Sequence, residues 1–336
     1  MQDKEIKIFY SKDWQDYELL DTGEGEKLER FGKYTFVRPY EDAVWPKALT
    51  EEVQKTWANA DGKFWSSKTG AKAGWKFKNN KISGETAEKW EMEYKGIKFL
   101  ASPTPFRHLG FFPEQATHWD FIEDKICART VLAQKEQKTE ARLPFKRKVK
   151  FLNLFGYTGV ASLFALRAGA EVTHVDASKQ ILNWAKENQN LNNHLNLDKL
   201  PMRVIEDDVM KFLAREEKRG NKYDAIIMDP PKFGRGPKGE TWKLEEMLPK
   251  LLTKVRSLLS DEPLFIILTS YATDASSLPL DYALMETMKP ARNASHSDAG
   301  GGFEGSVKAG ELCILEKSNN RFISLANTAI WSSNKN

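Results

Sequence analysis

Glycines and carboxylates follow short apolar runs in the second half of the chain, and each run has the pattern of a buried strand. The run Phe151–Phe155 is followed by glycines at 156 and 159, and Glu171–Asp176 ends in an acid. Glycine lets backbone N–H groups approach a ligand, because no Cβ intervenes. An acid after the next strand can accept hydrogen bonds from a ribose diol. We therefore predict a nucleoside site that includes Gly156, Gly159 and Asp176. Plain packing of a helix on a strand is the alternative for the glycines.

A third apolar run, Met202–Ile205, is followed by acidic residues that include Asp208. A carboxylate at this strand end can accept a hydrogen bond from an adenine amino group. Asp208 can also be only the N-cap of the next helix, a common place for aspartate. Capping alone accounts poorly for acids and glycines at successive strand ends, so we expect Asp208 to share one crevice with Asp176.

The fourth run, Tyr223–Met228, precedes Asp229-Pro230-Pro231-Lys232-Phe233, the most specific motif in the chain. Proline fixes the backbone and donates no N–H, so the Asp229 carboxylate and the Pro230 carbonyl are available as acceptors. The Phe233 ring can lie flat against a planar substrate. We predict that Asp229, Pro230 and Phe233 are the catalytic group, since a proline pair that only ends a strand would explain neither the acid nor the ring.

The elements that position these residues alternate between strands and helices, which predicts a parallel, doubly wound α/β sheet. Ligands of such sheets bind at the carboxyl ends of the strands. A fifth strand is expected at Leu264–Leu268, and Ser178 is expected to cap a helix. Helices are also expected at 117–132, 160–166, 209–214, 242–259 and 279–288, and later strands around 293–297 and 312–316, with a glycine-rich hairpin at 300–305.

Residues 1–105 predict a small antiparallel β-rich domain that precedes a larger domain at 106–336. Short aromatic runs separated by turn residues are typical of such β domains. The tryptophans of this part have two possible functions. They could stack on bases while nearby lysines meet phosphate, or they could fill a small core that needs large side chains. We favour the core for most of them. The expected strands are at 17–21, 27–31, 34–38, 75–77, 90–94 and 97–101.

The composition is that of a globular protein, with 40% hydrophobic and 29% charged residues in a chain of 336. A net charge of +4 permits a nucleic-acid partner without requiring one. Cys127 and Cys313 form no CxxC pair and the histidines form no HExxH motif, so we expect no metal. No apolar stretch reaches membrane length and the N-terminus does not look like a signal peptide, so we expect a cytoplasmic protein and no membrane partner.

Taken together, the motifs resemble a class I S-adenosylmethionine-dependent methyltransferase. They resemble more closely the bacterial 23S rRNA methyltransferase family, which includes 5-methylcytosine and guanine-N7 enzymes. The motifs are Gly110–Gln115, Asn153–Gly159, Val175–Ser178, Glu206–Val209 and Asp229–Phe233, and the resemblance covers about residues 110–270. It implies a Rossmann-like sheet with an antiparallel last strand, S-adenosylmethionine as cofactor, and RNA as partner of a monomer or homodimer.

The resemblance also implies a role for each motif. The glycine turn would hold the methionine part of the cofactor, Asp176 the ribose and Asp208 the adenine. Gln115 would close over the cofactor, and the segment that begins at Asp229 would face the substrate. The residues expected to bind the cofactor are Gln115, Phe155, Gly156, Tyr157, Thr158, Gly159, Asp176, Ala177, Ser178, Asp208, Val209 and Asp229.

One departure from the family bears on the reaction. The cytosine-C5 members carry a nucleophilic cysteine just after the fifth strand, where this chain has Leu268-Thr269-Ser270-Tyr271-Ala272. Attack on C6 of a pyrimidine needs such a nucleophile, so we expect transfer to a base nitrogen in rRNA. Three alternatives stay open. They are methylation of a protein or small molecule, a nicotinamide oxidoreductase, which the absence of GxGxxG argues against, and a non-catalytic RNA-binding module that retains the cofactor for stability.

Overall fold

The computed structural model describes residues 5–65, 73–78, 82, 88–139, 148–235, 241–271, 276–290 and 302–334, without the side chains of 132–139 and 235. The chain divides into two compact units. Unit 1 contains Met1–Phe9, Thr117–Leu312 and Leu325–Asn336, and unit 2 contains Tyr10–Ala116 and Cys313–Ser324. This division differs from the continuous domains expected at 1–105 and 106–336. Unit 1 includes the first residues of the chain, and unit 2 includes a segment close to its C-terminal end.

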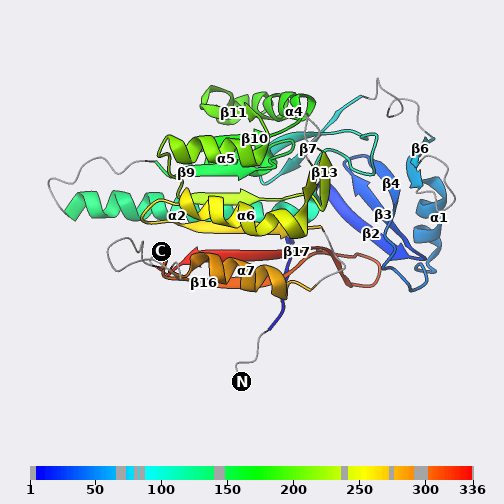
Figure 1. Cartoon of the computed structure of the whole chain (residues 1–336). Coiled ribbons are helices and arrows are strands. Elements are labelled where there is room, and N and C mark those ends of the chain that lie inside the picture. The colour runs from blue at the N-terminus through cyan, green and yellow to red at the C-terminus, as the bar shows by residue number, and fades with distance from the viewer. Residues whose placement is uncertain are drawn as a thin grey trace. The chain divides into compact units, whose positions relative to one another are not determined.

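Unit 1 is built on an eight-stranded sheet in the order β1-β16-β17-β15-β12-β9-β10-β11 (Figure 1). Five neighbouring strands run parallel, ending at the edge strand β11: β9 (Lys150–Leu154), β10 (Glu171–Asp176), β11 (Met202–Glu206), β12 (Ala225–Met228) and β15 (Phe265–Ser270). β17 (Phe322–Ser333) runs antiparallel beside β15, and β16 (Gly305–Leu315) pairs in parallel with β1 (Lys7–Phe9). The predicted doubly wound sheet with an antiparallel last strand is confirmed.

Helices cover both faces of this sheet, which explains why its central strands are apolar along most of their length. α5 (Val209–Lys218), α6 (Leu244–Ser257) and α7 (Leu278–Met288) lie side by side on one face, in green, yellow and orange in Figure 1. α2 (Ala116–Thr139), α3 (Val160–Arg167) and α4 (Lys179–Asn190) pack on the other face, where the rings of Trp119 and Phe164 stack 5.6 Å apart. The strand order reverses between β9 and β12, so the loops that follow these strands flank the switch point of the sheet.

The strands and helices expected from residue 117 to residue 288 are confirmed within a few residues, except in α2, which continues to Thr139. The strand expected around 293–297 and most of the hairpin expected at 300–305 lie outside the described residues. β17 was not expected from the sequence, because Asn327 and Thr328 interrupt its apolar pattern. Both side chains are buried in the structure, and the Thr328 hydroxyl forms a hydrogen bond with His118 Nε2 at 3.0 Å.

Unit 2 contains a five-stranded sheet in the order β2-β3-β4-β5-β6, and a separate hairpin of β7 and β8. The expected antiparallel arrangement is wrong at one pair, because β4 and β5 run parallel. The helix α1 (Glu51–Asn59) crosses between them, and a parallel pair requires such a crossover. The strands are β2 (Tyr17–Gly23), β3 (Glu26–Phe31), β4 (Tyr34–Pro39), β5 (Gly62–Trp65), β6 (Gly74–Phe77), β7 (Trp90–Tyr94) and β8 (Ile97–Ala101).

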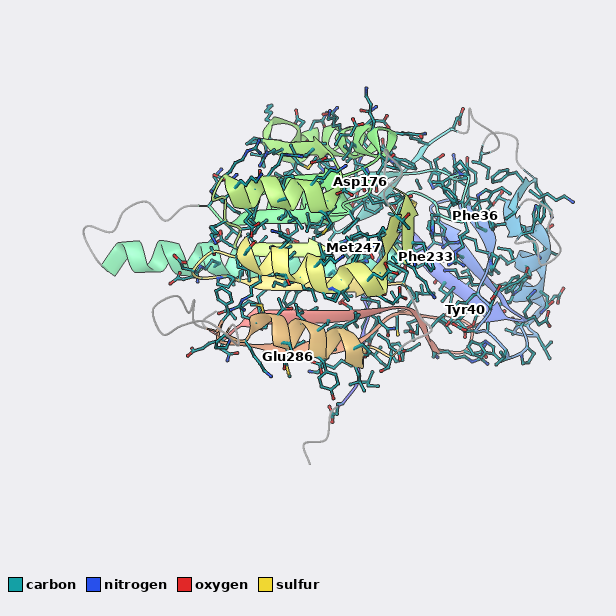
Figure 2. All side chains as sticks on the ribbon, in the orientation of Figure 1. Phe36, Tyr40, Asp176, Phe233, Met247 and Glu286 are labelled. Atoms are coloured by element: carbon teal, nitrogen blue, oxygen red, sulfur yellow. The ribbon has the colours of Figure 1, made fainter. Side chains whose placement is uncertain are left out.

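Aromatic side chains fill the interior of unit 2, which confirms the core function for several of its tryptophans. The ring of Trp90 stacks on that of Phe36, labelled in Figure 2, with 5.8 Å between centroids. The Trp14 ring lies 4.6 Å from the Tyr94 ring. Trp65 is different, because 41% of it is exposed, so the stacking function stays a prediction for this residue.

A buried carboxylate, Glu29 on β3, joins the polar groups of the unit 2 core. It accepts hydrogen bonds from Arg38 Nε at 2.7 Å and Nη2 at 2.6 Å, and from the Tyr17 hydroxyl at 2.9 Å. Lys27 Nζ lies 3.3 Å from Glu29 Oε1. Burial opposes ionisation, but the charges of Arg38 and Lys27 outweigh burial and hold the pKa of Glu29 at about 2. Glu29 is therefore a charged part of the core at neutral pH.

Candidate functional site

The loop between β9 and α3 has an uncommon backbone conformation. Phe155, Tyr157 and Gly159 have φ angles of 57°, 50° and 83°. A residue with a Cβ rarely adopts positive φ, and each such residue costs about 1–3 kcal/mol. Strain of this kind persists where the surrounding structure holds it, and it is concentrated at ligand sites and other functional positions. The loop predicted to bind a nucleoside is therefore also a strained segment of unit 1.

Gly156 allows this loop to lie directly on the histidine of β10. A Cβ added at position 156 would lie 2.3 Å from His174 Cε1 and 2.5 Å from its Nδ1, so no larger residue fits without moving the ring. The Gly156 amide donates to the Val175 carbonyl at 3.0 Å. Gly159 has a different reason to be glycine, since its positive φ suits a residue without a Cβ. These two glycines fit the loop closely against β10.

Asp176, at the end of β10, holds the loop from the other side. Its Oδ2 accepts from the Tyr157 amide at 3.0 Å, and its Oδ1 accepts from the Ser178 amide at 2.9 Å. Burial raises the pKa of Asp176, while the backbone N–H groups of Ser178, Tyr157 and Ala177 oppose the increase. Each carboxylate oxygen has a further lone pair, so these two contacts leave Asp176 able to accept from ribose hydroxyls.

The residues after Asp176 begin α4. Ser178 is the N-cap of this helix, as expected, and its hydroxyl accepts from the Ile181 amide at 3.4 Å. Ala177 lies between the carboxylate and the cap, where its amide faces Asp176. This turn places several N–H groups around a single carboxylate.

Asp208 caps α5, because its Oδ1 accepts from the Lys211 amide at 3.0 Å. The capping interpretation is thus confirmed, and the adenine contact stays a prediction for the remaining carboxylate oxygen. The next residue, Val209, is buried at the first turn of the helix. The Asp207 amide donates to the Asp176 carbonyl at 3.1 Å. This bond brings the end of β11 beside the end of β10.

The motif that begins at Asp229 follows β12 and leads into a short hairpin of β13 (Phe233–Arg235) and β14 (Thr241–Lys243). Asp229 is half-buried, Pro230 is buried, and Phe233 is 65% exposed. Figure 2 labels Asp176 and Phe233, which both lie at the end of the sheet where its parallel strands finish. The aromatic ring predicted to meet a substrate is thus exposed at this end of unit 1.

Trp242 connects this motif to the strained loop, and sequence analysis did not identify it as part of the site. It was expected to begin a helix but lies in β14. Its indole Nε1 donates to the Pro231 carbonyl at 2.6 Å, and its ring meets the Phe155 ring at 5.2 Å, edge to face. The Pro231 carbonyl is therefore bonded within the protein, and Phe155 packs partly against the core.

Gln115 is the predicted site residue that lies outside unit 1. It ends the short helix η2 (Pro113–Gln115) in unit 2 and is buried. Its contact with the cofactor stays a prediction. Among the described residues, no group of three His, Cys, Asp or Glu side chains has the arrangement of a metal site. No helix within the described ranges has both the length and the apolar character needed to cross a bilayer.

A family model described as S-adenosylmethionine-dependent methyltransferase matches residues 47–294. The chain belongs to this family. This assignment favours the methyltransferase over the nicotinamide oxidoreductase, and it gives S-adenosylmethionine as the cofactor. The strained loop and the partly free Asp176 carboxylate are suited to such a ligand.

Comparison with individual proteins agrees with the family. The crystal structure of the SAM-dependent methyltransferase from Agrobacterium tumefaciens has a TM-score of 0.81 and 39% identity, over 97% of this chain and 93% of that one. Ribosomal RNA large subunit methyltransferase I of Pseudoalteromonas translucida is 36% identical over 50% of this chain and 44% of its own length. Ribosomal RNA large subunit methyltransferase K/L of Vibrio cholerae is 30% identical over 53% of this chain and 22% of its own length. The match therefore covers less than half the length of these two curated relatives.

Proposed function

We propose that this methyltransferase transfers a methyl group to a base nitrogen in ribosomal RNA. The observation that carries the proposal is the arrangement after β12, where a half-buried carboxylate, Asp229, precedes the exposed ring of Phe233 at the carboxyl end of the sheet. A planar base can lie on such a ring while the carboxylate accepts its N–H. The names of the two ribosomal RNA methyltransferase relatives support RNA as the substrate.

The cofactor half of the site consists of the loops after β9, β10 and β11. Bound S-adenosylmethionine supplies an electrophilic methyl group. In our proposal the loop 155–159 holds its methionine part, Asp176 accepts from the ribose with Ala177 and Ser178 beside it, and Asp208 with Val209 faces the adenine. The paired amides of Tyr157 and Ser178 fix the Asp176 carboxylate before any ligand arrives, so little reorganisation is needed on binding.

The substrate half consists of Asp229, Pro230 and Phe233. Asp229 and the Pro230 carbonyl accept hydrogen bonds that align the base, and Phe233 stacks on it. A base nitrogen is nucleophilic once it is aligned and its proton has an acceptor, so the enzyme's main contribution is positioning. The bond from Trp242 to the Pro231 carbonyl fixes the backbone that carries these acceptors.

The positions of the cysteines favour nitrogen over carbon as the methylated atom. Methylation of C5 of a pyrimidine needs a covalent nucleophile on C6. Tyr271 occupies the place where a cysteine-dependent relative would carry it. Cys127 lies within α2 and Cys313 lies buried within β16. Neither residue follows a parallel strand of the sheet, where the acids of the proposed site are found.

The test is transfer of a radiolabelled methyl group from S-adenosylmethionine to total RNA by the full-length chain, followed by nucleoside mass spectrometry. Protein extract and small metabolites serve as parallel acceptors. Label in an N-methylated purine supports the proposal, whereas 5-methylcytosine refutes transfer to nitrogen. Label in the protein or metabolite fraction refutes RNA as the substrate. Tight cofactor binding without transfer to any acceptor would indicate the non-catalytic module.

The same proposal includes a cytoplasmic location, where ribosomal RNA is available, and a monomer or homodimer without a metal or a membrane partner. Light scattering of the purified chain, alone and with RNA, measures the oligomeric state directly. A larger assembly would contradict this part of the proposal.

A further inference from the structure

Beneath the strained loop, three buried polar side chains form a continuous hydrogen-bonded chain. The Asn153 amide nitrogen lies 3.0 Å from Ser162 Oγ, and Ser162 Oγ lies 3.0 Å from His174 Nδ1. The other ring nitrogen, His174 Nε2, lies 3.1 Å from the carbonyl oxygen of Tyr157. All three side chains are buried. These hydrogen bonds therefore connect the interior of β9, through side chains of α3 and β10, to the backbone of the loop.

The chemistry of its ends fixes the direction of every bond in this chain. The Tyr157 carbonyl can only accept, so His174 Nε2 carries the hydrogen and donates it. Nδ1 is then an acceptor and takes the hydrogen of the Ser162 hydroxyl, whose oxygen in turn accepts from the Asn153 amide. Burial lowers the pKa of His174 to about 4, against the bond to Tyr157. The ring is thus neutral at physiological pH and has one defined tautomer.

The Tyr157 peptide group is consequently held on both sides. Its N–H donates to Asp176 at 3.0 Å, and its C=O accepts from His174 at 3.1 Å. The next carbonyl, of Thr158, accepts from the Asn188 amide at 2.9 Å. Side chains from β10 and α4 therefore fix two successive carbonyls of a loop whose φ angles are unfavourable.

We propose that His174 is a positioning residue that keeps the loop 155–159 in its ligand-binding conformation through the Tyr157 carbonyl. The inference rests on the proposed cofactor function of this loop. His174 itself is buried under Gly156 and acts only through the backbone. If the bond holds the strained conformation, its loss lets the loop relax, and the cofactor must then restore the conformation at a cost in affinity.

Two amide substitutions separate positioning from simple core packing. In His174→Gln the side-chain amide reaches about as far as Nε2 and keeps a donor for Tyr157. In His174→Asn the amide ends near the place of Nδ1, so it retains the neighbourhood of Ser162 but does not reach the carbonyl. Both variants remove the ring and both disturb the core.

Calorimetry with S-adenosylmethionine should show that His174→Asn weakens binding about tenfold or more, since it leaves a loop carbonyl without its donor. His174→Gln should weaken binding by less than about threefold. The thermal midpoints of the two variants should fall by similar amounts. The proposal is overturned if both variants lose cofactor affinity in proportion to their loss of thermal stability. It is also overturned if the affinity of His174→Asn is unchanged.

Ser162→Ala provides a milder test that leaves the ring in place. Without the hydroxyl, Nδ1 loses its hydrogen-bond partner, but the Tyr157 carbonyl can still only accept, so Nε2 should keep the hydrogen and the bond to the loop. Nitrogen-15 NMR should show the Nε2–H tautomer of His174 in the wild type and in Ser162→Ala, with cofactor affinity in the variant reduced by less than about threefold. An Nδ1–H tautomer in the wild type, or a loss of affinity in Ser162→Ala as large as that in His174→Asn, overturns the proposal.

The variant Asp176→Asn tests the cofactor function of the loop 155–159 separately from the positioning function of His174. If Asp176→Asn loses affinity while His174→Asn does not, the loop binds the cofactor and only the inference about His174 is wrong. If neither variant loses affinity, the cofactor function of the loop fails as well. Calorimetry needs no RNA, so the outcome does not depend on which substrate is methylated.

Discussion

Replacing Asp176 by asparagine should reduce S-adenosylmethionine affinity strongly, although the two side chains have the same shape. The carboxylate uses both oxygens, Oδ2 for the Tyr157 amide and Oδ1 for the Ser178 amide. An asparagine side chain has one oxygen and one NH₂ group. Whichever way it turns, its NH₂ group faces a backbone N–H, and two donors cannot pair.

The magnitude follows from the bonds that are lost. A hydrogen bond to a charged acceptor contributes about 1.5–3 kcal/mol. The variant loses one such bond within the loop and weakens the acceptor for the ribose hydroxyls, so the combined loss is about 2–4 kcal/mol. At about 1.4 kcal/mol for each factor of ten, the dissociation constant should rise about 30- to 1000-fold.

Calorimetric titration of the wild type and Asp176→Asn measures this change. Asp61→Asn is a matched control in unit 2, where the carboxylate accepts from the Thr35 amide at 2.8 Å and its hydroxyl at 3.1 Å. The control should keep its affinity even if its thermal midpoint falls. Affinity in Asp176→Asn within about twofold of the wild type would remove Asp176 from the ribose position.

The pH dependence of binding provides a second check on Asp176. Because burial raises its pKa, affinity should begin to fall at a higher pH than an exposed aspartate would give. The raised pKa of Asp176 affects the folding of the ligand-free protein in the opposite direction. The stabilising contribution of Asp176 to the folded state is complete below the unfolded pKa and is lost as pH rises through the higher folded pKa. Acidification should therefore weaken cofactor binding while it relieves the cost of burying this charge. A flat affinity profile from neutral pH down to the ordinary aspartate pKa contradicts the assignment.

Four further predictions test separate parts of the molecule. Asp229→Ala should reduce kcat by about 100-fold or more while cofactor affinity changes far less, as separate kinetics and calorimetry would show. Cys127→Ser and Cys313→Ser should each keep turnover within about twofold, and a cysteine-dependent covalent adduct with RNA would disprove this. Trp65→Ala should weaken RNA binding about 5- to 150-fold if the ring stacks on a base, as filter binding would measure. Glu29→Gln should reduce the free energy of unfolding by about 3 kcal/mol at pH 7. That difference, measured by denaturation, should disappear as pH falls through about 2, because a depressed pKa stabilises only above the unfolded value.

Local pattern was enough to predict the strands β9, β10, β11, β12 and β15, the helices between them and the strand-end acids, but not β1, β13, β14 or β17. β12 and β15 are buried along their whole length and have continuous apolar sequences, and acids mark the ends of β10, β11 and β12. Asp176 and Asp229 were predicted as site residues in this way. Asp208 shows the limit of the method, because a helix cap and a ligand acceptor have the same sequence pattern.

The supporting residues could not be predicted, because their function depends on partners that are distant in the sequence. His174 looks like an ordinary residue of a strand until Gly156 and the Tyr157 carbonyl are placed against it. Trp242 precedes an amphipathic helix, and only the tertiary structure brings it to Phe155 and Pro231. The glycine at 156 was the available signal in the sequence, since glycine often marks a close approach of the backbone to another group.

The turn between β16 and β17 affects the order in which this protein can be completed during synthesis. The turn and the strand ends that flank it, residues 313–324, belong to unit 2, where the Lys317 amide donates to the Leu19 carbonyl at 2.9 Å and the Ser318 hydroxyl to Asp21 at 2.6 Å. The Thr22 hydroxyl likewise donates to Glu316 within unit 2. A ribosome makes the first strands of unit 2 long before it makes these partners. Asp21 can already accept from the Ala48 amide and the Trp57 indole, but its bond from Ser318 and the bond from Thr22 to Glu316 form only after nearly the whole of unit 1 has been made. A chaperone that protects nascent chains would therefore meet unit 2 in an incomplete state.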